Sequence, residues 1–280
     1  MRRSAAKGFT KAMPYSRELI DTHAHLSDQQ FDADREAVIH RAHENNVSAI
    51  ITVADSLESW SSTIQLAQQY PDLYAAIGIH PHNADAAMRD PRGLQKSMHE
   101  IVVEQHVVAV GETGLDYYKN YASVELQKKL FLLHCVIAGE TERPLIIHCR
   151  SAYADLIMLL RDFCRAHGTS CTGVVHCFSG TYADAEELGA LGLFLGIDGP
   201  ITFPNSASLR DTIARVPITR LLIETDCPYL APQAFRGKRN EPMFLSHIAR
   251  AIAEVKNRDE SEVCAATTKN ARGLFQLSGR

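Results

Sequence analysis

The sequence predicts an α/β fold, a single (β/α)8 barrel of the TIM type, and three observations carry that prediction. The chain has 280 residues, of which 45% are hydrophobic, and this is enough to bury one large core. Eight short runs rich in apolar and β-branched residues recur along it. Amphipathic stretches long enough for helices separate most of these runs, and such alternation is typical of parallel strands joined by crossover helices.

The eight apolar runs are continuous rather than alternating, which suits strands covered on both faces. In chain order we expect strands at Glu18 to Thr22, Val47 to Val53, Leu73 to Ile79, Val107 to Val110, Pro144 to Ile147, Gly173 to Val175, Leu193 to Ile197 and Arg220 to Ile223. Of the helices between them, one is expected to begin at Ser123, whose side chain can cap it, and another to end at Gly168.

The ends and the composition of the chain set further limits. Residues 1–16 are basic and interrupted by Pro14, so we expect a poorly ordered N-terminal extension there and a single domain over residues 17–280. Seven cysteines without a C-x-x-C pair or a secretory signal favour a reducing, cytoplasmic location. The sequence contains no run of about 18 apolar residues, so it predicts no membrane-spanning helix. A net charge of -4 leaves no global basic field, so a nucleic-acid substrate needs local cations or metal ions.

Ionisable side chains follow most of the predicted strands. They are His23 and His25 after the first, His80 and His82 after the third, Glu112 after the fourth, His148 after the fifth, His176 after the sixth and Asp226 after the eighth. In a barrel of parallel strands these positions meet at one face, where active sites lie. Glu112, His148, His176 and Asp226 each occur singly, and such a residue taken alone is more often a helix cap or a loop contact, whereas the pair His23 and His25 is as compatible with a metal site as with ordinary hydrogen bonds. Together they favour a metal site.

The set is larger than one catalytic ion requires. His23 and His25 are two apart on an extended segment, so their side chains leave the same side and can hold one ion together. Two divalent ions that share a bridging carboxylate use the whole set, and Mg, Mn, Zn and Fe are all compatible with it. We expect His23, His25 and Asp226 on one ion, His148 and His176 on the other, and Glu112 on both.

The motifs DTHAHL, GIHPH, GETGLDYY, HCR, HCFSGT, ETDCPYLAP and GKRNEP occur in this order between residues 21 and 242, and the chain resembles the TatD deoxyribonucleases over almost its whole length. It departs from their usual pattern at Ala24 and Ser27, neither of which is an expected ligand. The resemblance implies a metallo-dependent hydrolase barrel with a binuclear divalent-metal site that hydrolyses phosphodiester bonds in DNA. Glu112, rather than a lysine, at the bridging position argues against dihydroorotase-like or lactonase-like relatives.

The expected reaction is exonucleolytic attack by a metal-activated water on DNA. In that reaction Asp226 orients or deprotonates the water. His80 either contacts the substrate or protonates the leaving group, or else serves only as a hydrogen-bond partner behind the ligands. Arg150, Lys238 and Arg239 are the candidate phosphate-binding cations, although the last two can equally be solvated or paired with Glu241.

The expected partner is DNA with single-stranded or frayed ends, and the protein is expected to be a monomer or a weak oligomer. Aromatic side chains that follow strand ends are candidates for base stacking, namely Tyr117, Tyr118, Phe178, Phe203 and Tyr229. Two other functions stay open. One is a metal-dependent ester or amide hydrolase, such as a D-aminoacyl-tRNA deacylase, and the other is a non-catalytic docking protein.

Overall fold

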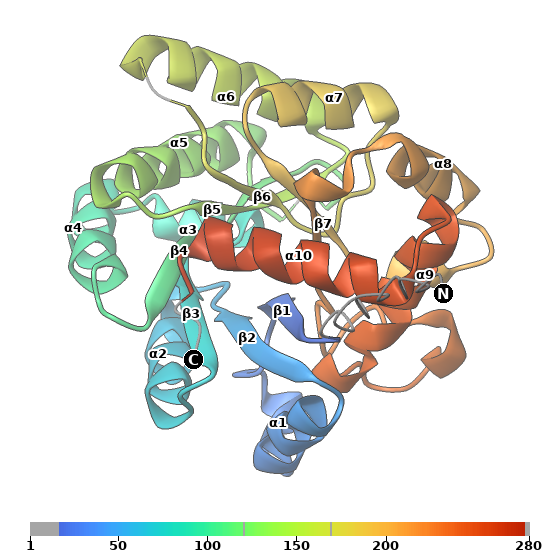
Figure 1. Cartoon of the computed structure of the whole chain (residues 1–280). Helices are drawn as coiled ribbons and strands as arrows, with labels where there is room; N and C mark the ends of the chain where they lie inside the picture. The colour runs from blue at the N-terminus through green and yellow to red at the C-terminus, as the bar shows by residue number, and fades with distance from the viewer. Residues whose placement is uncertain (1–16, 120, 169, 278–280) are drawn as a thin grey trace, which may run out of the picture.

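A computed structural model of the chain describes residues 17–119, 121–168 and 170–277. The expected N-terminal extension, residues 1–16, lies outside the described residues. Eight parallel strands form one sheet in the order β1 to β8, and helices surround it (Figure 1), so the predicted barrel is confirmed. The strands are β1 Leu19–Ala24, β2 Val47–Val53, β3 Leu73–Ile77, β4 Val107–Asp116, β5 Leu145–Arg150, β6 Gly173–Val175, β7 Phe194–Ile197 and β8 Leu221–Ile223.

The barrel closes where the segment after β8 meets the end of β1. The amide N–H of Asp226 donates to the carbonyl of His23 over 2.8 Å, and that of His25 donates to the carbonyl of Cys227 over 2.8 Å. An isolated parallel bridge also joins Ala24 to Cys227. Backbone hydrogen bonds therefore hold Asp226 next to His23 and His25, about two hundred residues earlier in the sequence.

The helices follow the strands in regular alternation. They are α1 Arg35–Glu44, α2 Leu57–Gln69, α3 Ala84–Ala87, α4 Pro91–Val102, α5 Val124–Thr141, α6 Tyr153–His167, α7 Tyr182–Ala190, α8 Ala207–Arg215, α9 Leu245–Lys256 and α10 Glu260–Phe275. Short 3-10 helices lie in the connections at Gln29–Phe31, Pro81–Asn83, Gly199–Thr202, Ile218–Arg220, Gln233–Phe235 and Pro242–Phe244. The Ser123 side chain accepts from the Leu126 amide at the start of α5, and Gly168 ends α6 with a φ of 61°, both as expected.

Apolar side chains fill the inside of the barrel, and α10 covers one end of it. Ile20, Ile51, Val108 and Ile146 belong to one buried cluster with Phe275 of α10. Figure 1 shows α10, in red, running across the strands rather than beside them. Since α10 occupies the end at which the strands begin, the opposite end is the one left for polar side chains.

Several strands extend further than their apolar runs. β4 was predicted to end at Val110 but continues to Asp116, and β5 continues to Arg150. The two pair in register, with Gly114 opposite His148 and Asp116 opposite Arg150. The hydrogen bonds between the two strands join backbone groups, so the pairing continues where the side chains become polar. Glu112 and His148 therefore lie inside strands rather than after them, which corrects the expectation.

Two of the seven cysteines are paired. Cys164 and Cys171 form a disulfide with their Cα atoms 6.4 Å apart, and the other five are free thiols. The pair is local: it joins the end of α6 to the loop before β6, and no sequence motif marks it. In the described part of the chain, we find no helix with the length and apolar character needed to cross a bilayer.

Candidate metal centre

The buried carboxylate of Glu112 lies at the middle of the candidate site. Its Oε2 atom is 3.4 Å from Nε2 of His23 and 3.7 Å from Nε2 of His25. Its Oε1 atom is 2.6 Å from Nε2 of His176, 3.0 Å from Nδ1 of His148 and 3.6 Å from Nε2 of His80. Each oxygen thus faces its own group of imidazoles, and the two groups adjoin where the rings of His23 and His176 stack, with centroids 4.0 Å apart.

The first group comes from β1 and from the segment after β8. Oδ1 of Asp226 lies 3.6 Å from Nε2 of His23 and 3.4 Å from Nε2 of His25. Nδ1 of His25 is 3.1 Å from the carbonyl of Val53 and must carry the proton, since a carbonyl only accepts. In the neutral ring the lone pair of His25 is therefore on Nε2, the atom that points toward the carboxylates.

The second group is oriented by a carboxylate that sequence reasoning missed. Oδ2 of Asp116 lies 3.2 Å from Nε2 of His148 and 2.9 Å from Nε2 of His82. The other oxygen, Oδ1, accepts from the amides of Tyr118 and Lys119 at 2.9 Å each. Glu112 and Asp116 are four apart on one strand, so they face the same side, and that spacing was the available signal.

His80 presents a donor rather than a lone pair to the site. Its Nδ1 accepts from the backbone amide of His82 over 3.2 Å, so the proton of the neutral ring is on Nε2. Nε2 faces Oε1 of Glu112. In this tautomer Nε2 of His80 has no lone pair to offer a metal ion at the site.

The donor set fits divalent metal ions. Three overlapping groups each bring their ligand atoms within 4.8 Å of one another, namely His23 with His176 and Asp226, His23 with His25 and Glu112, and His80 with Glu112 and His148. Nε2 of His23 and Nε2 of His25 are 3.2 Å apart, as are Nδ1 of His148 and Nε2 of His176. Buried nitrogens and carboxylate oxygens that converge so closely are the ligands that borderline divalent cations prefer.

The carboxylates of the site are charged. Burial alone would raise the pKa of Glu112, but His176 and His148, both within hydrogen-bonding distance of Oε1, outweigh it and hold that pKa well below its ordinary value. Burial likewise opposes ionisation of Asp226, yet the hydrogen bond from His25 and the positive charge of that ring lower the pKa of Asp226. Two negative groups therefore lie within the cluster at neutral pH.

The imidazoles divide into two classes. Burial lowers the pKa of His23 to about 4 and that of His80 to about 3, which keeps both neutral. Burial also lowers the pKa of His25 and His148, but the adjacent carboxylates outweigh it and raise both to about 9. In the ion-free protein these two rings carry a second proton, which a metal ion must displace.

A second layer of buried carboxylates lies behind the ligands. Oε1 of Glu224 accepts from the Cys177 amide over 2.6 Å and lies 3.7 Å from Nδ1 of His176. A Cβ atom at Gly196 would meet Oε2 of Glu224 at 2.3 Å, so the carboxylate occupies the space that this glycine leaves. Burial raises the pKa of Asp198 to about 8 and that of Asp21 to about 7. Sequence reasoning missed these groups, because nothing local distinguishes them from helix caps.

A sequence profile of the TatD related DNase family matches residues 20–276. The chain belongs to this family. It is therefore a metal-dependent hydrolase with a TIM barrel, and its His, Glu and Asp cluster is suited to hold the metal.

Relatives of known sequence and structure agree with this assignment. The chain is 37% identical over 261 residues to an uncharacterized metal-dependent hydrolase, YabD, of Bacillus subtilis. The aligned region covers 93% of this chain and 100% of that protein. It is 36% identical over 266 residues to a 3′-5′ ssDNA/RNA exonuclease, TatD, of Pectobacterium parmentieri, with 93% and 100% covered. The crystal structure of the TatD homologue YjjV of Escherichia coli superposes with a TM-score of 0.85 at 32% identity, over 93% of this chain and 98% of that one.

The candidate phosphate-binding cations of this TatD family member differ in their surroundings. Arg239 donates to both carboxylate oxygens of Asp34, over 2.8 and 2.7 Å, and to Glu241 over 2.9 Å. Its guanidinium is therefore held in ion pairs, including the expected pair with Glu241. Lys238 is exposed. Arg150 is exposed at the end of β5, and its guanidinium carbon lies 3.9 Å from the centroid of the Tyr118 ring.

The five aromatic candidates also divide. The Tyr117 hydroxyl donates to Asp155 over 2.7 Å, and Phe178 is buried against Tyr153. Phe203 is half-buried and lies under the guanidinium of Arg236. Only Tyr118 and Tyr229 of the five are exposed, at 61% and 50%.

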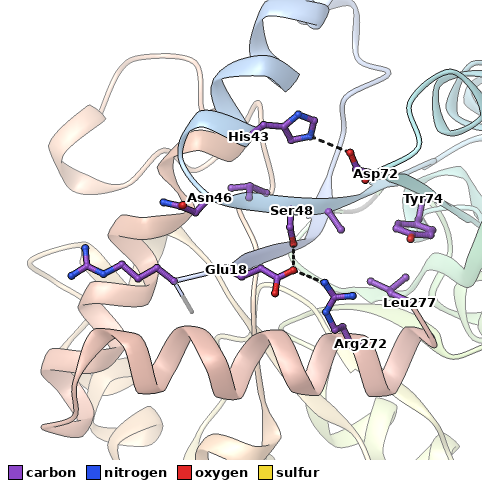
Figure 2. A pocket seen from close by; sticks show the side chains of 11 residues that line it. Glu18, His43, Asn46, Ser48, Asp72, Tyr74, Arg272 and Leu277 are labelled. Carbon is purple, nitrogen blue, oxygen red and sulfur yellow. Dashed lines mark hydrogen bonds and ion pairs between the residues drawn. The ribbon is translucent and has the colours of Figure 1, made fainter. Parts of the chain in front are cut away.

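A separate cavity lies at the other end of the barrel, where β1, β2 and β3 begin (Figure 2). In its wall Glu18 bonds to both Ser48 and Arg272, and His43 pairs with Asp72. None of its lining residues belongs to the metal cluster, so the cavity is not part of the candidate centre.

Proposed function

We propose that this protein is a two-metal nuclease that removes nucleotides from single-stranded or frayed ends of DNA. The observation that carries the proposal is the position of Glu112, whose two oxygens face two distinct groups of imidazoles at 2.6 to 3.7 Å. The relative from Pectobacterium parmentieri, which is named as a 3′-5′ ssDNA/RNA exonuclease, supports a nucleic-acid substrate.

In this proposal Glu112 would hold both ions. His23, His25 and Asp226 would complete the first site, and His148 and His176 would complete the second, with Mg, Mn, Zn or Fe as candidate metals. Ions bound there would supply activation of water and polarisation of a phosphoryl oxygen. The cytoplasmic location and the monomeric or weakly oligomeric state expected from the sequence stay predictions.

The residues of the chain supply orientation and proton handling. Asp226, a charged carboxylate beside His25, orients the attacking water and accepts its proton at a carboxylate oxygen. His80 is neutral because burial lowers its pKa to about 3, so it holds no extra proton for a leaving group. Its Nε2–H is instead placed to donate a hydrogen bond to a substrate oxygen, and we assign it substrate contact.

The test is hydrolysis of a 3′-labelled or 5′-labelled single-stranded oligonucleotide with Mg²⁺ or Mn²⁺, in parallel with duplex DNA, RNA, an aminoacyl-tRNA and simple esters and lactones. Glu112→Gln and His148→Ala are expected to abolish turnover, while circular dichroism shows a retained fold. His40→Ala, a change of an exposed histidine on α1, is the matched control. Retained turnover in Glu112→Gln would refute the assignment, and hydrolysis of only the acyl substrates would favour the deacylase alternative.

A further inference from the structure

Exposed aromatic side chains gather around the metal centre. Within residues 17–119, 121–168 and 170–277, the exposed large aromatic residues are Tyr118 at 61%, Tyr121 at 64% and Tyr229 at 50%. Tyr118 and Tyr121 follow β4, and Tyr229 follows β8, so all three lie beyond the ends of strands that carry candidate ligands. Exposed rings are hydrated at a cost, and their concentration at one place indicates a binding surface.

Two of these tyrosines contact imidazoles of the site. The ring of Tyr121 lies perpendicular to that of His82, at 90° and with centroids 4.8 Å apart. His82 shares the Asp116 carboxylate with His148. The ring of Tyr229 lies 6.0 Å from that of His25 in the first group. The edge formed by Tyr118 and Tyr121 is thus continuous with the second group of ligands.

Two cations accompany Tyr118 and Tyr121. The guanidinium carbon of Arg150 lies 3.9 Å from the Tyr118 centroid, and Nζ of Lys119 lies 5.8 Å from the centroids of both tyrosines. Among the described carboxylates, none forms a salt bridge with Arg150 or Lys119, whereas Arg239 is held by two. Both cations therefore keep their charge available to an anionic ligand.

We propose that Tyr118, Lys119, Tyr121 and Arg150 form a subsite for one unpaired nucleotide of the substrate, beside the second group of ligands. The base stacks on the exposed ring of Tyr121, and Lys119 and Arg150 hold the adjoining phosphates. Arg150 lies over the Tyr118 ring, which leaves Tyr121 as the open stacking surface. This inference rests on the proposed nuclease function and adds to it the residues that select the substrate.

The subsite accounts for a preference between strands. A nucleobase in a duplex is already paired and stacked on both sides, so it has no free face to offer. An unpaired base has one, and stacking on an aromatic ring strengthens binding by about tenfold or more, with little dependence on base identity. Tyr121 is accordingly expected to favour single strands and frayed ends over closed duplex ends.

The experiment compares wild type, Tyr121→Ala and Tyr121→Phe on a single-stranded oligonucleotide and on the same oligonucleotide with abasic positions at its end. Steady-state kinetics with Mn²⁺ gives KM and kcat, and fluorescence anisotropy gives the binding affinity without turnover. Tyr121→Ala is expected to raise KM about tenfold on the normal strand with kcat little changed. Tyr121→Phe keeps the ring and is expected to restore KM. On the abasic strand the three proteins are expected to be alike. Leu57→Ala, a change of an exposed apolar residue on α2, is the matched surface control.

The outcomes separate the subsite from the nuclease function. The subsite alone is overturned if wild type cleaves the strand and Tyr121→Ala has the same KM. It is also overturned if Tyr121→Ala raises KM equally on the normal and the abasic strand. Binding that depends on Tyr121 without any cleavage contradicts the proposed function alone. A protein that neither binds nor cleaves the oligonucleotide contradicts both.

Discussion

Asp116 and His148 are joined across two neighbouring strands, with Oδ2 of the carboxylate 3.2 Å from Nε2 of the ring. Because this contact uses Nε2, the other nitrogen of His148 is turned toward Glu112, where Nδ1 lies 3.0 Å from Oε1. The register of β4 and β5 thus sets which atom of the ring is available to a metal ion.

Asp116→Asn is expected to weaken metal-dependent turnover by about 10-fold to 100-fold, since such carboxylates orient a ligand and raise its basicity. A titration with Mn²⁺ is the readout, and the activation curve should move to higher metal concentration with a largely preserved melting temperature. Asp162→Asn, at an exposed site on α6, serves as the control. An activation curve for Asp116→Asn that coincides with that of wild type would contradict the role of Asp116 in orienting His148.

Metal affinity is expected to rise with pH. The pKa values of His25 and His148 are about 9 without ions, so below that pH each ring holds a proton that binding must release. Raising the pH from 6 toward 9 deprotonates them, and affinity should increase about tenfold per pH unit for each proton displaced. Calorimetry in buffers of different ionisation enthalpy counts those protons. An affinity that is flat over this range argues against both pKa assignments.

His134 makes folding stability depend on pH. It is buried in α5, where Nε2 accepts from the Ile79 amide over 3.1 Å and Nδ1 donates to the Leu130 carbonyl over 2.8 Å. Burial lowers its pKa to about 4, so the neutral ring is favoured in the folded state. This stability is present above the unfolded pKa near 6.5 and is lost as the pH falls toward 4.

His134→Leu leaves the Ile79 amide without its acceptor and is expected to lower the free energy of unfolding by about 1–3 kcal/mol at pH 8. The difference from wild type should shrink between pH 6.5 and 4, because only wild type loses the contribution of this ring. Urea unfolding of the ion-free proteins at both ends of that range measures it. A difference that is the same at both pH values would show that His134 does not titrate as described.

Gly114 allows β4 and β5 to approach each other. Its φ is 145°, and a Cβ atom there would lie 2.0 Å from the carbonyl oxygen of His148. Gly114→Ala is therefore expected to destabilise the fold by roughly 2–4 kcal/mol and to move His148 relative to Glu112. Gly139→Ala, in α5 with open space at its Cβ position, should instead stabilise it by about 0.5–1 kcal/mol. Chemical denaturation of the pair measures both, and similar shifts in the same direction would contradict this account of the strand packing.

The barrel was predictable because short apolar runs alternate with amphipathic, helix-length stretches along the sequence, and ionisable side chains follow most of the runs. The run Val47–Val53 was predicted with the bounds that the structure has. β4 was predicted too short, because backbone pairing with β5 continues through Glu112 and Asp116 after the apolar run has ended. Local sequence carries no record of that pairing.

The candidate ligands were predictable for the same reason, whereas their surroundings were not. Asp116 contacts His148, and Tyr121 contacts His82, across segments that are distant in the sequence. The partner of Arg239 was left open between solvent and Glu241, and only the folded chain brings Asp34 of the segment before α1 against it. Tertiary contacts of this kind depend on register and loop path, which residue spacing does not encode.

The proposed function depends most on a pair of ions on the two sides of Glu112. Anomalous scattering from a crystal grown with Mn²⁺ tests this directly. We expect two peaks, one bounded by His23, His25 and Asp226, the other by His148 and His176, with one oxygen of Glu112 directed at each. A single peak, or peaks that do not contact Glu112, would contradict the two-metal account.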